Sequence, residues 1–201
     1  ACGTAWHACL TAKFLIENDA DVFAVDHKKQ NALHFATRVD WRKMSTEKSE
    51  VSCFGIIKLL IEKGADANTQ NNLGWTPLMS AGTLEVAKYL VEKGGTDVNI
   101  VSNYGGTAVH HAAYLGELDI LEFYISKGGK IDTIDSDGKT PLYHVFKYRS
   151  SLSESEIDVS IKKAELLLAH NADINAKDKQ GKMPIHYAAV SNCIEYVEFL
   201  I

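Results

Sequence analysis

The residues Thr76-Pro77-Leu78-Met79 begin a block that the chain repeats along its length. Similar blocks are Thr4-Ala5-Trp6-His7, Asn31-Ala32-Leu33-His34, Thr107-Ala108-Val109-His110, Thr140-Pro141-Leu142-Tyr143 and Met183-Pro184-Ile185-His186. The first positions of successive blocks are 27, 45, 31, 33 and 43 residues apart. Self-similarity at such a spacing indicates a repeat architecture, in which each repeat is one supersecondary unit.

A second block closes each complete unit. It reads Ile61-Glu62-Lys63-Gly64-Ala65-Asp66-Ala67-Asn68 in one unit and Leu168-Ala169-His170-Asn171-Ala172-Asp173-Ile174-Asn175 in another. Together the two blocks resemble the ankyrin repeat, which has a period of about 33 residues and a Thr-Pro-Leu-His turn before two helices. The resemblance implies an all-α fold, a solenoid of stacked helix-turn-helix units with β-hairpin-like finger loops.

The blocks divide the chain, 1–201, into six units of a single ankyrin-like domain. Their approximate bounds are 1–26, 27–71, 72–102, 103–135, 136–178 and 179–201. We expect the first and last units to be incomplete. The chain begins at Ala1 without Met and ends in an apolar outer helix, where a terminal repeat would have a polar face. We therefore expect a fragment of a longer protein.

The residue types within a unit predict its helices. Prolines suit the first turn of an inner helix, where the missing N–H would have no partner, and the preceding Thr can cap that helix. These prolines are Pro77, Pro141 and Pro184. Apolar residues from Ile120 to Ile125 predict an outer helix. A left-handed C-cap favours Gly or Asn after such helices, and the predicted positions are Gly64, Gly94, Gly128 and Asn171.

Four units depart from the common length. The second has about 12 extra residues between its helices, at 39–51, and the fifth about 10, within 147–160. Ser49 and Ser155 are the predicted N-caps of the outer helices after these inserts. Whether the inserts bind a partner or are surface decoration stays open. The third unit is about three residues short and the first about six, too few to keep a turn between two helices. Either these units are degenerate or, as we favour for the first, residues are missing from the sequence.

Composition and motifs argue against several functions. The chain has 21 Lys and Arg against 26 Asp and Glu, a net charge of −5, which disfavours binding to nucleic acid. No apolar run approaches the roughly 20 residues that span a bilayer, so direct membrane insertion is not expected. Because catalytic and Cys-pair metal motifs are absent, we predict no enzyme activity, no cofactor, and no catalytic or metal-binding residues.

The histidines and acidic residues of the blocks have structural interpretations. By the resemblance, the fourth block position is a hydrogen-bonding site between neighbouring fingers, and it holds His7, His34, His110 and His186. The spacing of Asp132, Asp135 and Asp137 suits calcium, but the remaining ligands of an EF-hand are missing, so a solvated finger is favoured. Asn68 and Asn175 lie in a context similar to that of hydroxylated ankyrin asparagines, although finger hydrogen bonding is the simpler role.

The resemblance implies a protein-binding groove, concave and lined by finger tips and inner helices. The predicted protein-binding residues are Trp75, Tyr104, Tyr114, Tyr148, Lys28, Arg38, Lys139, Lys147 and Lys182. Exposed aromatic residues are common anchors of protein interfaces, so we predict that Trp75, Tyr104 and Tyr114 form the centre. In the alternative, Trp75 or Tyr104 packs against the next finger. The surplus of Lys and Arg on this surface favours a partner with an acidic or mixed apolar surface.

These observations favour a non-enzymatic scaffold for protein–protein interaction, monomeric and intracellular, in the cytoplasm. The alternative is a targeting or regulatory module of a larger effector enzyme or membrane channel. The bias of 18 Lys to 3 Arg fits an AT-rich genome, which leaves open a pathogen effector directed to the host cytoplasm. Sequence alone does not name the partner.

Overall fold

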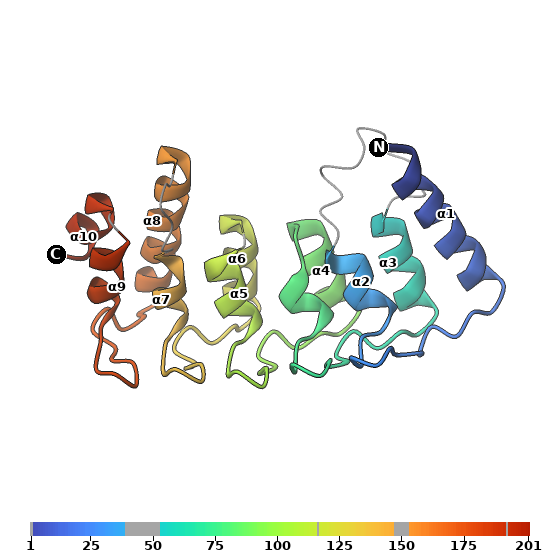
Figure 1. The fold of residues 1–201 in the computed structure, drawn as a ribbon, viewed down its shortest axis with the longest axis horizontal. Helices are drawn as coiled ribbons and strands as arrows, with labels where there is room; N and C mark the ends of the chain where they lie inside the picture. Colours follow the sequence, from blue (N-terminus) through green and yellow to red (C-terminus); the bar gives the residue numbers. More distant parts are fainter. Residues whose placement is uncertain (1, 39–52, 116, 147–152, 192) are drawn as a thin grey trace. The chain divides into compact units, whose positions relative to one another are not determined.

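The computed structural model describes residues 2–38, 53–115, 117–146, 153–191 and 193–201 (Figure 1). The chain divides into two compact units, Ala1–Asp97 and Val98–Ile201, which we call unit 1 and unit 2. Across the described ranges, the regular elements are all helices. The all-α fold class predicted from the sequence is therefore confirmed.

Unit 1 is built from short helices joined by finger loops. Its elements are α1 (Cys2–Glu17), α2 (Ala32–Arg38), α3 (Cys53–Glu62), the 3₁₀ turn η2 (Pro77–Ser80) and α4 (Leu84–Glu92). The inner helix α2 packs against α3 and η2, and α3 packs against α1 and α4. Leu33, Ile57 and Leu90 are completely buried, so these contacts form the apolar core of the unit.

The first and third repeats, which are shorter than the others, have reduced helices. Both repeats lie in unit 1. Residues 4–7 lie inside α1, a single 16-residue helix without an internal turn. This agrees with the expectation that a unit six residues short cannot keep its turn. In the third repeat the inner helix is reduced to the four-residue η2. This shortening agrees with a repeat that is about three residues shorter than the others.

The described residues of unit 2 form three pairs of inner and outer helices. They are α5 (Ala108–Tyr114), α6 (Leu118–Ser126), α7 (Pro141–Val145), α8 (Glu154–Ala169), α9 (Pro184–Val190) and α10 (Ile194–Leu200). Each inner helix packs on its own outer helix, and α7 packs between α5 and α9 while α8 packs between α6 and α10. The finger loops that precede α5, α7 and α9 project from the same side of the unit, below the helices in the view of Figure 1.

The helix N-termini confirm the predicted positions of the prolines but not the predicted capping residues. Each of the three prolines lies in the first turn of its helix. The side chains of Thr76 and Thr140 make no cap hydrogen bond, so their predicted capping role is wrong. The cap of α8 is Ser153, in a capping box with Glu156. The prediction of Ser155 fails because the helix begins before it; Ser49 and the insert segments 39–51 and 147–152 lie outside the described residues.

The C-termini of the outer helices follow the predicted rule with one exception. Gly64, Gly128 and Asn171 have φ values of 90°, 82° and 68°, as predicted. In the third repeat Gly95, not Gly94, has the positive φ, 64°. The reason is that the loop after α4 contains one residue more than the corresponding loops. A Cβ on Gly94 would lie only 2.6 Å from the carbonyl oxygen of Leu90, so close packing explains this glycine instead.

Candidate protein-interaction surface

The described finger tips share one backbone geometry. In each, the N–H of the first residue donates to the carbonyl oxygen of the fifth, and the N–H of the fourth donates back to the first. The first residues are Asp26, Asn71, Ser102, Asp135 and Asp178. Their side-chain oxygens accept further backbone N–H groups of the same tip. A short polar side chain at this position thus fixes the whole turn.

Backbone hydrogen bonds also join neighbouring tips. In unit 1 the N–H of Asn72 donates to the carbonyl oxygen of Lys28 at 2.8 Å. In unit 2 the N–H of Ser136 donates to Tyr104 at 2.7 Å, and that of Lys179 to Asp137 at 2.9 Å. Within each unit, therefore, the tips are held in register and present their side chains from a fixed backbone.

The fourth block position joins an inner helix to the next finger, as predicted. His34 places Nε2 2.9 Å from the carbonyl oxygen of Trp75. His110 accepts the N–H of Thr107 on Nδ1 at 3.1 Å, and its Nε2 lies 3.3 Å from the carbonyl oxygen of Lys139. Burial lowers the pKa of His110 to about 4, which keeps the imidazole neutral. The side chain of His7 lies outside the described residues.

Among the described residues, His186 has only the first of these two kinds of contact: its exposed ring accepts the N–H of Met183 on Nδ1 at 3.0 Å. In the fifth repeat Tyr143 occupies the position of the histidine. The hydroxyl of Tyr143 lies 2.7 Å from the carbonyl oxygen of Lys182 and also reaches that of Ala176. Burial raises the pKa of Tyr143 to about 12. The longer ring thus reaches the next finger directly.

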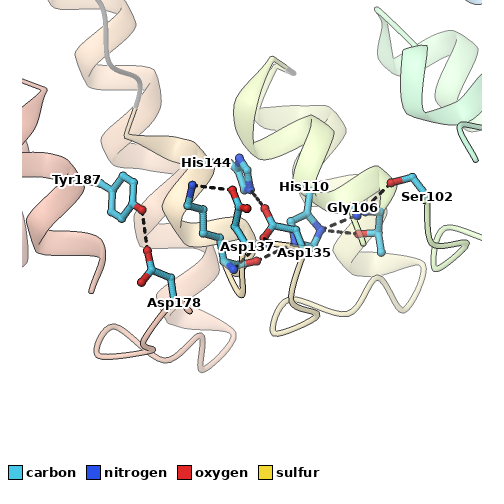
Figure 2. Close-up of polar contacts among 10 residues, drawn as sticks. Ser102, Gly106, His110, Asp135, Asp137, His144, Asp178 and Tyr187 are labelled. Carbon is cyan, nitrogen blue, oxygen red and sulfur yellow. Dashed lines mark hydrogen bonds and ion pairs between the residues drawn. The ribbon is translucent and has the colours of Figure 1, made fainter. Parts of the chain in front are cut away.

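The residue after the fourth block position points back to its own finger tip. The Nε2 of His144 lies 2.9 Å from Asp135, and the Tyr187 hydroxyl donates to Asp178 at 2.6 Å (Figure 2). Burial opposes ionisation of both aspartates, but hydrogen bonds outweigh it and lower the pKa of each. In the second repeat, which belongs to unit 1, the same position holds Phe35, which cannot bond to a carboxylate and is 51% exposed.

The predicted binding residues lie on these tips and inner helices where they are described. In unit 1, Lys28 and Arg38 are exposed and Trp75 is half-buried. In unit 2, Tyr104 is 57% exposed and Tyr114 43%, whereas Lys139 is half-buried and Lys182 exposed. Lys147 and Tyr148 lie outside the described residues. A common centre of Trp75, Tyr104 and Tyr114 remains a prediction.

The lysines at the tips of unit 2 are matched by acidic residues. Lys139 Nζ lies 3.1 Å from Asp137 and 5.0 Å from the ring centroid of Tyr187. The charged residues of the second and third tips in unit 2 are Lys139, Lys179, Lys182, Asp135, Asp137 and Asp178. The surplus of positive charge predicted for the whole surface is therefore not a property of these tips.

Sequence reasoning missed Phe35 and Lys29. Phe35 occupies the same repeat position as the polar residues His144 and Tyr187, so an alignment of inner-helix positions would have shown that an apolar residue stands at a position that is polar in other repeats. Lys29 occupies the fourth position of a tip, where the others have glycine, and it adopts a positive φ of 57°. Both residues belong to the second repeat, next to the predicted Lys28 and Arg38.

Within the described ranges, no cluster of three or more His, Cys, Asp or Glu side chains could hold a metal ion. No helix in the described part of the chain is long and apolar enough to cross a membrane. The Oδ1 of Asp135 accepts the backbone N–H groups of Asp137 and Lys139, which assigns this aspartate to the finger tip.

Comparison with known proteins agrees with this geometry. A family model described as "Ankyrin repeats (3 copies)" matches residues 48–135, 82–163 and 110–201. Human and mouse inversin are each 26% identical to the chain over 160 residues, which cover 66% of this chain and 15% of inversin. The chain thus corresponds to a small part of the length of these relatives. Because the family model matches most of the sequence, the chain belongs to the ankyrin-repeat family.

Proposed function

We propose that this chain is a non-enzymatic module that binds a partner protein through its finger tips and the exposed sides of its inner helices. Ankyrin repeats generally mediate protein–protein interaction, and family membership supports the general class of function. The surface and its residues are our proposal, as are its action as an intracellular scaffold and its monomeric state.

The observation that carries this proposal is the combination of a fixed backbone with exposed aromatic side chains. The carbonyl oxygen of Tyr104 is held by the N–H of Ser136, while the Tyr104 side chain is largely exposed. A backbone that is already ordered loses little further freedom on binding, which favours affinity. Exposed tyrosines can supply both apolar contact and a hydrogen bond to a partner.

The test is affinity capture from cells that express the protein, with the chain immobilised. We compare wild type with W75A/Y104A/Y114A and with a control, E85A/K88A/E122A, whose side chains are exposed on outer helices. A specific partner should be retained by wild type and control, and its affinity for the aromatic variant should fall by about 2 kcal/mol or more. Thermal melting verifies that each variant is folded.

If affinity for the aromatic variant stays within about 0.5 kcal/mol of wild type, these residues are not binding anchors. If the control loses the partner while the aromatic variant keeps it, binding uses the outer helices and the proposed surface is wrong.

A further inference from the structure

The finger-tip surface of unit 1 has an apolar centre. We define it as the tips 26–31 and 71–76 with the exposed side of α2. Phe35 on α2 is 51% exposed and Leu73 at the next tip 44% exposed, and the half-buried Trp75 follows Leu73 by two residues. Large apolar side chains held at an exposed surface often mark a protein-binding site.

The elements that carry these apolar residues contact one another. Asn72 makes two hydrogen bonds to the first tip. Its backbone N–H donates to the carbonyl oxygen of Lys28, and its side-chain Nδ2 donates to the carbonyl oxygen of His27 at 3.0 Å. Leu73 is therefore held beside the tip that carries Lys28. The helix α2 also packs against η2, which follows the second tip.

Positive charge surrounds this centre. The charged residues of 26–38 and 71–80 are Lys28, Lys29, Arg38 and Asp26. The Oδ1 of Asp26 accepts the backbone N–H groups of Lys28 and Gln30, both at 2.8 Å, as Asp135 and Asp178 do at their own tips. Counted in the same way as those aspartates, this one negative residue faces three positive residues and leaves a net positive charge. Elsewhere in the described part of unit 1, acidic residues occupy α1, the outer helices and the loops that follow them.

Unit 2 gives an internal comparison. At its second and third tips three lysines are matched by three aspartates, and its inner helices α7 and α9 place polar His144 and Tyr187 where the second repeat, in unit 1, has Phe35. The two units therefore present different chemistry from the same repeat positions. Only the surface of unit 1 combines an exposed phenylalanine with a net positive charge among its described residues.

We propose that the finger-tip surface of unit 1 binds an acidic segment of the partner protein, with a bulky apolar residue of that segment packed on Phe35 and Leu73. Carboxylates on either side of the apolar residue pair with Lys28, Lys29 and Arg38. This inference rests on the proposed function and names the chemistry of the partner. Opposite charge at the rim favours encounter and selects against basic partners.

The test begins with selection of short random peptides displayed on phage against the full chain. The enriched peptides should carry net negative charge around at least one aromatic or large aliphatic residue. Their affinities are then measured by fluorescence anisotropy with K28E/K29E/R38E and, separately, with F35S. Each variant should weaken binding by about tenfold or more, which corresponds to about 1.4 kcal/mol. Higher salt should weaken wild-type binding, because exposed charges are screened.

A matched control carries the same change of charge at another place. K63E/K88E/K93E alters exposed lysines of unit 1 that lie on or after its outer helices, and it should bind the peptides within about twofold of wild type. If this control weakens binding as much as K28E/K29E/R38E, the effect is one of net charge and the inference is wrong. Circular dichroism and melting confirm that the variants are folded.

Other outcomes separate this inference from the proposed function. Enrichment of neutral or basic peptides, or affinity that is unchanged by both unit 1 variants, overturns the acidic-segment inference. If those peptides lose affinity for Y104A/Y114A, protein binding by the tips still stands. If no set of tip variants affects them, the proposed function fails as well. Tighter binding of a single-stranded DNA oligonucleotide than of the peptides, lost in K28E/K29E/R38E, would assign the surface to nucleic acid and overturn the inference.

Discussion

The Nζ of Lys163 on α8 lies 3.2 Å from the carbonyl oxygen of Ala113 at the end of α5. Lys163 is only 1% exposed. Carbonyl groups in the last turn of a helix have no partner within that helix, and a cation there is favoured by the helix dipole. The matching position of the other outer helices is apolar: Ile56, Val86, Ile120 and Tyr196. The contact between the fourth and fifth repeats thus contains a buried lysine.

This lysine gives a first prediction. Lys163→Ala should lower the free energy of unfolding by about 2–4 kcal/mol, because it removes a buried side chain and leaves a cavity. Lys163→Met should stay within about 1 kcal/mol of wild type or exceed it, because an apolar side chain of similar length fills the space without a buried charge. Urea unfolding at neutral pH measures both. Equal losses in the two variants would show that the ammonium group itself stabilises the contact.

A second prediction concerns the close approach of neighbouring fingers. Gly105 and Gly181 have nearly the same positive φ, 76° and 73°. A Cβ on Gly105 would lie 2.7 Å from the Cα of Asp135, whereas a Cβ on Gly181 would meet no atom within 4 Å. Gly181→Ala should cost about 1–2 kcal/mol from the dihedral alone, and Gly105→Ala should cost clearly more. Chemical unfolding of both variants tests this, and similar losses would mean that the fingers can separate freely.

A third prediction concerns Tyr143. Tyr143→Phe keeps the ring but removes the hydroxyl that the carbonyl groups of Ala176 and Lys182 accept. The expected loss of stability is about 0.5–1.5 kcal/mol. Amide hydrogen exchange should also become faster in the finger that contains Ala176. Tyr104→Phe is the control, because that side chain is exposed, and it should leave stability nearly unchanged. A Tyr143→Phe protein with wild-type stability would contradict the assigned role.

The fourth prediction is a loss of stability in acid. Burial, with a smaller effect of His144, lowers the pKa of His110 and His111 from 6.5 to about 4. Because the folded-state pKa lies below the unfolded value, the unfolded chain binds protons first as the pH falls from about 6.5 to about 4. The free energy of unfolding should therefore be fully present above pH 6.5 and should decrease through this window, by up to a few kcal/mol.

Urea unfolding at pH 7, 5.5 and 4.5 measures this decrease. His111→Gln should make the pH dependence less steep, whereas His27→Gln, a change at an exposed tip residue, should leave it as in wild type. A free energy of unfolding that stays constant from pH 7 to pH 4.5 would show that these imidazoles are not held neutral by the fold.

Much of the fold could be predicted from the sequence because the same local signals for helix starts and ends recur in each repeat. Pro77, Pro141 and Pro184 mark helix starts by a strictly local effect, the missing N–H. Asn171 was correctly assigned to a left-handed C-cap for the same local reason. Gly94 was assigned wrongly, because one additional residue in its loop moves the positive φ to Gly95, and spacing counted from the helix does not reveal that shift.

The surface was less predictable than the fold. Trp75, Tyr104 and Lys28 could be placed on finger tips by repeat position alone. The net charge of the tips depends on which side chains the fold brings together. Asp137 pairs with Lys139, and Asp135 and Asp178 lie at tips that the sequence analysis predicted to be basic. Phe35 is 51% exposed, whereas His144 and Tyr187 at the same repeat position are half-buried, a difference that periodicity along one helix does not show.

The most direct test of protein recognition by the finger tips is hydrogen exchange of the chain alone and saturated with the partner protein captured in the affinity experiment. We predict slower amide exchange at the tips 26–31, 71–76 and 102–107 and in α2 and α5, with no change in the outer helices α4 and α6. Protection confined to α4, α6 and α8, with unchanged tips, would contradict the account.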